Sequence, residues 1–284
     1  MRLLLTGADG FTGVHLTQAA SKAGFEVFPL KSDLSNAGAL KEEVAQIAPT
    51  HVIHLAGISA VTHANQQEFY KVNLFGTLNL LDALLKAKGP IQKIILASSA
   101  NVYGNTESNS IGEDLAPLPV NQYAMSKLAM EYMARSYLDN LPIIFTRPFN
   151  YTGVGHDTRF AIPKIIEHFK KNAPVIELGN MTVQREYNDV RNVCNIYLDL
   201  LEQGQVGEVY NICSGRTSSL NLVMAELRRL TGQIIEVRVN PNFVRKNEIE
   251  VLAGNPEKLE KCIGKVNWRP LEDTLNWMLE KTPV

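Results

Sequence analysis

The sequence is poor in cysteine, and this shortage limits the kind of protein it can be. It has three cysteines in 284 residues, Cys194, Cys213 and Cys262. They are odd in number and far apart, which argues against a disulfide framework and against a clustered metal site. We therefore expect no metal site and a reducing, cytoplasmic environment.

The chain also lacks long apolar runs and an excess of either charge. No run of about 18 apolar residues is present, so we expect no transmembrane helix. The apolar segment begins directly after Met1-Arg2, which leaves no room for a signal peptide. The 28 basic and 29 acidic residues nearly cancel, so no electrostatic footprint for nucleic acid or an anionic membrane is expected.

Short apolar runs alternate with amphipathic segments through the first 150 residues. We expect strands at 2–5, 26–30, 51–57, 91–97 and 143–147, with helices between them. This alternation predicts an α/β fold, a Rossmann-type doubly wound parallel sheet with helices on both faces. Ligands of such sheets bind at the carboxyl ends of the strands.

A glycine-rich turn lies between the first expected strand and the first expected helix. In the segment 7–13, Gly7 permits the tight turn, Gly10 lets the backbone approach a pyrophosphate, and Gly13 lets helix and strand pack closely. Phe11 lies inside the same turn. The phosphates would bind the free N–H groups at the helix N-terminus, so the turn predicts a dinucleotide cofactor.

The end of the second strand gives a mixed signal on which dinucleotide binds. Lys31 and Ser32 favour the 2′-phosphate of NADP(H), whereas Asp33 follows Gly13 by 20 residues, the distance of an acidic ribose ligand. Asp33 and Leu34 could instead cap the adenine. We favour NADP(H) and keep NAD(H) as the alternative.

The stretch from Ser98 to Lys127 contains the candidate catalytic residues. Tyr123 and Lys127 are four apart in an expected helix and therefore share one face. A neighbouring ammonium favours the phenolate and lowers the pKa of a tyrosine, which could then exchange a proton with a substrate oxygen. Ser99, at the end of the strand 91–97, could donate a second hydrogen bond to that oxygen.

Together, the glycine turn, Ser-Ser-x-x-Val-Tyr-Gly at 98–104 and Tyr-x-x-x-Lys resemble the extended short-chain dehydrogenase/reductase family. Its members oxidise, reduce, epimerise or dehydrate nucleotide-activated sugars, and the resemblance covers essentially the whole chain. It implies a Rossmann domain over 1–150 and 185–215. A smaller α+β domain that binds the nucleotide sugar would then cover 151–184 and 216–284.

The resemblance also assigns residues beyond the catalytic set. It implies four further residues at the cofactor site: Leu55, Ala56, Gly57 and Asn73. Asn73, in the middle of a helix, would hold the active site in shape; the alternative is an asparagine on the surface. It also implies contacts with the substrate by Asn101, Asn150, Arg185, Arg245 and Glu248. Arg185 could instead form a surface ion pair with Glu186.

Two positions bear on the reaction. Relatives that dehydrate sugars carry two carboxylates where this chain has Ala100 and Asn101, so a dehydratase is not expected. The motifs look most like the reductases that convert GDP-4-keto-6-deoxy-D-mannose to GDP-D-rhamnose. Three alternatives remain: a reductase of another nucleotide 4-ketosugar, a 4-epimerase, and a protein that only senses dinucleotide. The intact Ser, Tyr and Lys set argues against a protein that only senses dinucleotide.

The resemblance implies an oligomeric state as well. Relatives often form homodimers by packing the Tyr-x-x-x-Lys helix and the long helix before it into a four-helix bundle. We therefore expect a homodimer.

Overall fold

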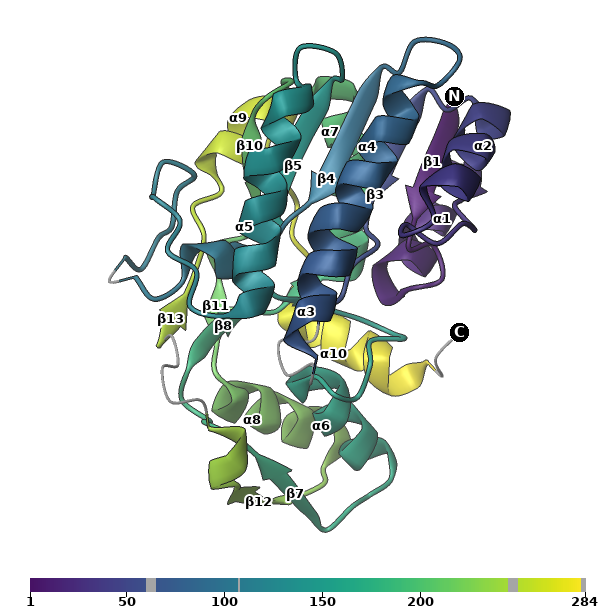
Figure 1. Cartoon of the computed structure of the whole chain (residues 1–284). Coiled ribbons are helices and arrows are strands. Elements are labelled where there is room, and N and C mark those ends of the chain that lie inside the picture. Colours follow the sequence, from purple (N-terminus) through teal and green to yellow (C-terminus); the bar gives the residue numbers. More distant parts are fainter. Residues whose placement is uncertain (60–64, 107, 245–249, 282–284) are drawn as a thin grey trace.

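The computed structural model describes residues 1–59, 65–106, 108–244 and 250–281, and a parallel sheet is its central element (Figure 1). Within these ranges six strands form the sheet in the order β10-β5-β4-β3-β1-β2. All of its pairings are parallel. The strands are β1 (Arg2–Thr6), β2 (Glu26–Pro29), β3 (His51–His54), β4 (Lys93–Ala97), β5 (Ile143–Pro148) and β10 (Val209–Ile212).

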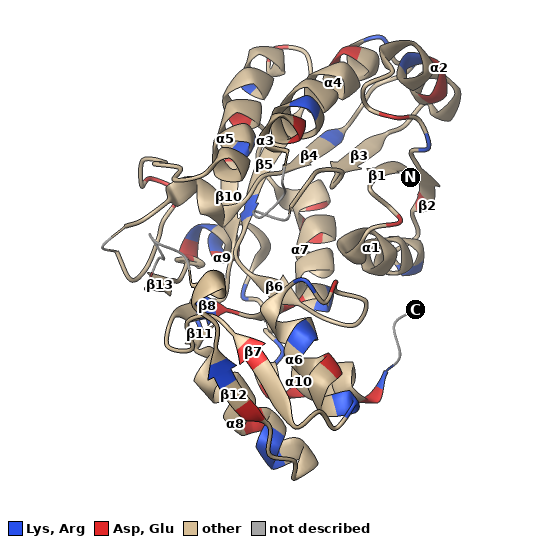
Figure 2. Ribbon diagram, turned by 60° about the horizontal axis from the view of Figure 1, so that its bottom comes forward, with Lys and Arg blue, Asp and Glu red and all other residues tan. Residues whose placement is uncertain are grey.

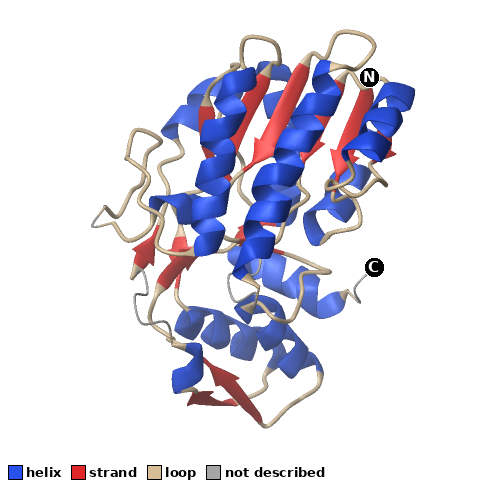
Figure 3. Ribbon diagram, viewed as in Figure 1, coloured by secondary structure: helices blue, strands red, loops and turns tan. Residues whose placement is uncertain are grey.

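Helices cover both faces of this sheet (Figure 3). One face carries α1 (Phe11–Lys22), α7 (Val190–Gln203) and α9 (Glu257–Ile263), and the other carries α2 (Ala37–Ile47), α4 (Thr77–Leu85) and α5 (Gln122–Ala134). Burial on both sides explains why the strands read as continuous apolar runs. The predicted doubly wound Rossmann-type fold is confirmed.

The order of the strands changes sides at β1, which pairs with β2 on one side and with β3 on the other. Such a switch point opens a crevice at the carboxyl ends of the strands, where ligands bind. The glycine turn follows β1 at this point. On the other side, β2 is the edge strand of the sheet and is only half-buried.

The long helix expected before β4 is interrupted in the middle. It runs through α3 (Gln66–Phe69), a π-helical segment (Tyr70–Gly76) and α4. Short 3₁₀ segments also follow β4 at Ala100–Tyr103, follow α5 at Arg135–Tyr137, and occupy Pro241–Phe243. π-Helical turns are often found at functional sites, and this one contains Asn73.

A smaller lobe lies at the carboxyl ends of the strands (Figure 1). It contains α6 (Ala161–Lys170), β7 (Val175–Leu178), α8 (Leu220–Thr231), β12 (Glu236–Val239) and α10 (Leu271–Glu280). Ile165, Leu227 and Leu275 are fully buried in its own apolar core. Short strands join the lobes, namely β6 (Tyr151–Thr152), β8 (Gln184–Glu186), β9 (Asn188–Asp189), β11 (Thr217–Ser218) and β13 (Val251–Leu252).

One segment packs differently from the predicted division. We assigned all of 216–284 to the smaller domain, but Leu259 of α9 and Trp268 belong to the core that α1 and α7 form on the sheet. Helix α9 returns to the larger lobe because its apolar side covers β10 and α7. The segment around residues 257–268 therefore belongs with the sheet.

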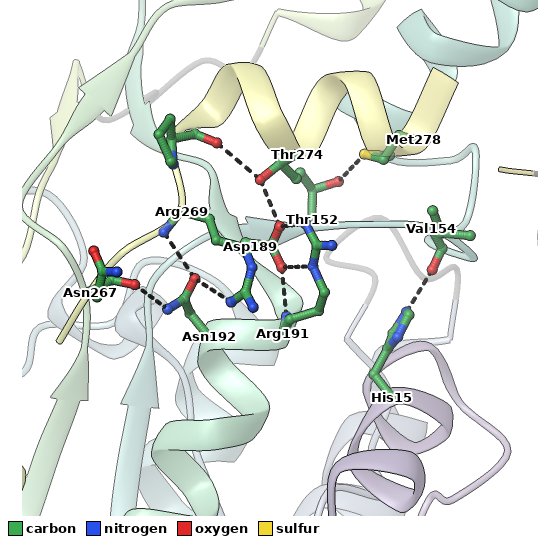
Figure 4. A network of polar contacts seen from close by, with 11 residues as sticks. His15, Thr152, Val154, Asp189, Arg191, Asn192, Asn267, Arg269, Thr274 and Met278 are labelled. Atoms are coloured by element: carbon green, nitrogen blue, oxygen red, sulfur yellow. Dashed lines mark hydrogen bonds and ion pairs between the residues drawn. The ribbon is translucent and has the colours of Figure 1, made fainter. Parts of the chain in front are cut away.

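A polar network fastens α7 to α10 of the smaller lobe (Figure 4). Buried Asp189 accepts hydrogen bonds from Arg191 Nη2 at 2.6 Å and from Thr274 Oγ1 at 2.8 Å. Burial alone would raise the pKa of Asp189, but hydrogen bonds from Arg191 and Thr274 bring it below its usual value. The guanidinium of Arg191 also lies 3.8 Å from the ring centre of Trp277.

Basic and acidic residues are both found along the outer helices of both lobes (Figure 2). No helix in the described part of the chain is both long enough and apolar enough to span a membrane.

Candidate active site

A cavity of about 790 Å³ opens at the carboxyl ends of the strands, between the two lobes. The larger lobe contributes the glycine turn, the ends of β4 and β5, and the first turns of α5. The smaller lobe contributes residues of the segment 155–160, and the joining strands β8 and β13 contribute Arg185 and Leu252. The cavity therefore lies where the switch point of the sheet predicts a ligand.

Ser99, Tyr123 and Lys127 come together on the wall of this cavity. Ser99 directly follows β4, and its Oγ accepts hydrogen bonds from the backbone N and the side-chain Nδ2 of Asn101 at 3.2 and 3.1 Å. Asn121 caps α5 by accepting from the backbone N of Ala124 at 2.9 Å. That cap fixes the start of the helix that presents Tyr123 and Lys127 on one face.

Burial dominates the protonation of the Tyr123 and Lys127 side chains. It raises the pKa of Tyr123, and a hydrogen bond with Ser99 offsets this only in part. Burial also lowers the pKa of Lys127 to about 8, against the favourable charge of Glu131. The Lys127 ammonium donates to the backbone oxygen of Ala97 at 2.8 Å.

This corrects the predicted electrostatics, because we expected Lys127 to lower the pKa of Tyr123. The reason is that both groups are withdrawn from water, and lost hydration penalises the phenolate more than its surroundings favour it. Tyr123 consequently keeps its proton at neutral pH and can donate it.

The glycine turn has the geometry of a phosphate cradle. Gly7 has φ +67° and accepts a hydrogen bond from Gly10 N at 3.1 Å. A Cβ on Gly13 would lie 2.0 Å from the oxygen of Gly7. Gly7, Gly10, Phe11 and Gly13 all line the cavity. So does Ser98, whose buried Oγ has no hydrogen-bond partner among the described residues. These features fit a cofactor that carries phosphates.

The predicted substrate residues fall into two groups. Asn101, Asn150 and Arg185 line the cavity, whereas Arg245 and Glu248 lie outside the described residues. Arg185 Nη1 donates to the backbone oxygen of Gln184 at 2.8 Å.

Comparison with known proteins shows the family to which the chain belongs. Residues 3–213 match the model of the NAD dependent epimerase/dehydratase family. The chain belongs to this family of enzymes. The predicted resemblance to the extended short-chain dehydrogenase/reductases is thereby confirmed.

Individual relatives cover nearly the whole chain. The GDP-6-deoxy-D-talose 4-dehydrogenase of Aggregatibacter actinomycetemcomitans is 33% identical over 269 residues, 93% of this chain and 92% of the relative. The GDP-6-deoxy-D-mannose reductase of Pseudomonas aeruginosa is 33% identical over 284 residues, 95% of this chain and 92% of the relative. The structure of RMD from Pseudomonas aeruginosa complexed with NADPH superposes with a TM-score of 0.90 at 32% identity, covering 98% of this chain and 97% of that one.

Three further residues predicted at the cofactor site of this epimerase/dehydratase family member follow β3. Leu55 and Gly57 line the cavity, whereas Ala56 lies outside the lining and packs behind the glycine turn. A Cβ on Gly7 would lie 3.0 Å from Ala56 N. Ala56 therefore shapes the turn from behind.

Asn73, also predicted at the cofactor site, lies behind the cavity wall. Its side chain is fully buried, which excludes the alternative of a surface asparagine. Its Oδ1 accepts from Ile58 N at 2.9 Å, and its Nδ2 donates to Ser126 Oγ at 3.0 Å. A Cβ on Gly57 would lie 2.8 Å from Asn73 Oδ1 and 3.2 Å from Lys127 Nζ. Asn73 thus joins the loop after β3 to α5 behind the cavity lining, an arrangement that agrees with the predicted role of holding the site in shape.

The predicted discriminating residues after β2 lie outside the cavity lining. The backbone N–H groups of Lys31 and Ser32 donate to the Glu43 carboxylate. Asp33 Oδ1 accepts from Ser35 N at 2.7 Å. Leu34 is packed into the core between α2 and α4, so its side chain is structural.

Sequence reasoning missed a segment of the smaller lobe that closes the cavity. His156, Asp157, Arg159 and Phe160 line it. The His156 ring stacks on Phe11 of the glycine turn, with ring centres 4.3 Å apart and an 8° angle. Burial lowers the pKa of His156 to about 4, so the ring is neutral. No local pattern around residue 156 indicates that it folds back onto α1.

A buried ion pair behind the cavity was also missed. Glu131, one turn after Lys127 on α5, accepts from Arg147 Nη2 at 2.7 Å and from Arg147 Nε at 3.0 Å. The two side chains are 1% and 5% exposed. The pair joins α5 to β5 and places a negative charge on the helix that carries Lys127.

Proposed function

We propose that this enzyme reduces the C4 keto group of a nucleotide-activated 4-keto-6-deoxyhexose with NAD(P)H. The substrate we propose is GDP-4-keto-6-deoxy-D-mannose and the product GDP-D-rhamnose. The observation that carries the proposal is the convergence of Ser99, a protonated Tyr123 and Lys127 on one cavity wall that also contains the glycine turn. The names of the two relatives at 33% identity support a GDP-linked 6-deoxyhexose.

The three side chains have separate roles in this mechanism. Tyr123 donates its proton to the oxygen at C4 as negative charge develops there. Ser99 Oγ donates a second hydrogen bond to the same oxygen, in an orientation set by Asn101. The Lys127 ammonium stabilises the charge left on the phenol oxygen. The bound cofactor supplies the hydride.

The raised pKa of Tyr123 suits a role as proton donor. A reductase needs a proton donor at C4, and a phenol that stays neutral at physiological pH is one.

The cavity wall also argues against dehydration. Elimination of water needs an acid and a base close to the sugar. Among the described lining residues the only carboxylate belongs to Asp157, which pairs with Arg159 at 2.9 Å. Ala100 and Asn101 occupy the positions where dehydratases carry carboxylates.

Positively charged and amide groups of the cavity lining suit the diphosphate of the substrate. We propose that Arg185 and Asn150 bind it, because a guanidinium forks onto phosphate oxygens. We propose NADP(H) as the preferred cofactor, because the basic Lys31 side chain and the Ser32 hydroxyl follow β2 and suit a 2′-phosphate. The three free cysteines support a cytoplasmic location.

We further propose a homodimer formed through α4 and α5. Large apolar side chains are exposed on these two helices and the π-helical segment before them. Phe75 is 59% exposed, Tyr132 62% and Met133 50%. Exposed apolar patches of this kind mark protein contacts.

The decisive experiment adds enzymatically prepared GDP-4-keto-6-deoxy-D-mannose to the protein with NADPH and, separately, NADH. We expect stoichiometric loss of absorbance at about 340 nm, the signal of the reduced nicotinamide. Tyr123→Phe should lose at least about 100-fold in rate, the usual contribution of a general acid, and still bind dinucleotide. No loss of signal with either cofactor, on protein that binds dinucleotide, would refute this substrate and favour another nucleotide sugar or a 4-epimerase.

A further inference from the structure

A carboxylate from α2 occupies the backbone donors at the end of β2. Glu43 Oε1 accepts from Lys31 N at 2.9 Å, and Glu43 Oε2 accepts from Ser32 N at 2.7 Å. The Ser32 hydroxyl hydrogen-bonds to the same carboxylate. Two adjacent N–H groups and a hydroxyl thus form a seat for an anion, and the chain fills it with its own side chain.

The protonation of Glu43 agrees with this contact. Burial alone would raise its pKa, but the hydrogen bonds from Ser32 and Lys31 lower it below its usual value. Glu43 is therefore a full negative charge at neutral pH. The side chain of Lys31 lies near enough to contribute to the same shift.

The seat lies directly after the end of β2. Strand β2 runs parallel to β1, and Leu30 N donates to Leu5 O at 2.9 Å. Leu30 lies one residue before the seat, and Leu5 lies two residues before the glycine turn. In folds of this class, the residues just beyond the second strand distinguish a 2′-hydroxyl from a 2′-phosphate. A 2′-phosphate would accept hydrogen bonds from the same kind of donors that Glu43 now occupies.

Asp33, the acidic residue that the sequence pointed to, is engaged elsewhere. Its carboxylate accepts from Ser35 N in the turn before α2. Lys71 favours the ionised form of Asp33 electrostatically. Of these two acids, Glu43 is the one that the structure places on the Lys31 and Ser32 donors.

We propose, on the basis of the dinucleotide site proposed above, that Glu43 limits the preference for NADP(H) by competing with its 2′-phosphate. The phosphate must displace the carboxylate from Lys31 N and Ser32 N before it can bind there. NAD(H) carries no phosphate at this position and leaves Glu43 in place. Glu43 therefore weakens binding of NADP(H) selectively, and its removal frees a seat that keeps Ser32 and the cationic Lys31.

The test compares Glu43→Gln and Glu43→Ala with wild type, and Glu42→Gln serves as the matched control. Glu42 is the neighbouring carboxylate on α2 and is exposed. Dissociation constants are measured for NADPH, NADH, 2′,5′-ADP and 5′-AMP. Both Glu43 variants should bind NADPH and 2′,5′-ADP about tenfold more tightly, since one charged hydrogen-bond contact is worth that much or more. Affinity for NADH and 5′-AMP, and every affinity of Glu42→Gln, should stay within about twofold.

Two outcomes would overturn the role of Glu43. An unchanged ratio of the NADPH and NADH affinities would show that the carboxylate does not compete. Equal weakening of both cofactors would show that Glu43 only holds the turn after β2.

A measurement on wild type covers the case in which both variants fail to fold. The amide resonances of Lys31 and Ser32 should shift on adding 2′,5′-ADP and stay in place with 5′-AMP; equal responses to both would refute the competition. No sugar is present in either experiment. The 4-keto substrate proposed above could therefore be wrong while the cofactor result stands, and the reverse is equally possible.

Discussion

The buried pair of Glu131 and Arg147 makes a sharp prediction about stability. Replacing Glu131 with Met leaves the guanidinium of Arg147 buried at 5% exposure without the carboxylate that accepts two of its hydrogen bonds. Removing one partner of a buried ion pair costs about 3–5 kcal/mol, because the remaining charge is desolvated and unpaired. That is a large share of the roughly 5–15 kcal/mol that stabilises a typical domain.

The effect on the melting temperature follows from the size of the chain. At about 2 °C per kcal/mol, Glu131→Met should lower the melting temperature by roughly 6–10 °C. Arg147→Met should cost a similar amount because it leaves the carboxylate unpaired. The double variant, with two methionines in place of both charges, should recover most of the loss, since apolar side chains of similar volume replace buried pairs at little net cost.

A double-mutant cycle measured by urea denaturation tests this reasoning. We expect a coupling energy of at least about 2 kcal/mol between residues 131 and 147, well above the value for independent sites. A double variant whose loss equals the sum of the two single losses would refute it. So would a loss below about 1 kcal/mol for Glu131→Met, because a pair that weak would behave like a surface ion pair.

Three other predictions follow. Burial lowers the pKa of Lys127 to about 8, and Lys127 acts as the ammonium, so kcat/KM for reduction should fall as the pH rises through about 8. A pH profile that rises there would contradict the role of Lys127. Gly13→Ala should abolish dinucleotide binding because its Cβ would lie 2.0 Å from a backbone oxygen, whereas Gly38→Ala, whose Cβ would lie 3.6 Å from its nearest atom, should bind normally in the same titration. Phe75→Asp should halve the mass measured by light scattering if α4 and α5 form the dimer, while Leu222→Asp, 54% exposed on the smaller lobe, should not.

The parts of the site that sequence could predict depend on spacing along the chain. The glycine turn can be read directly because three glycines at fixed intervals follow a strand and precede a helix. Tyr123 and Lys127 share a helix face whatever the helix packs against. Ser99 could be placed because it ends an apolar run, and the cavity indeed contains all of these residues.

The parts that sequence could not predict depend on contacts between distant segments. Glu43 reaches Lys31 and Ser32 across a turn and a helix, and Glu131 pairs with Arg147 16 residues away. The pKa of Tyr123 was predicted in the wrong direction for the same reason. Its neighbouring charge is visible in the sequence, whereas its burial results from the packing of the whole site.

The order of the sheet explains why α2 carries the proposed cofactor discriminator. The chain leaves β2 and enters α2 within residues 30–36, and the next strand, β3, lies on the far side of β1. No described strand of the sheet therefore covers the outer edge of β2. Helix α2 packs over β1 and β3 through Leu40 and Val44. Because this packing fixes the helix, the adjacent Glu43 faces the strand end. The acid that we propose as a competitor of the 2′-phosphate is thus supplied by the following helix instead of by the tip of β2 itself.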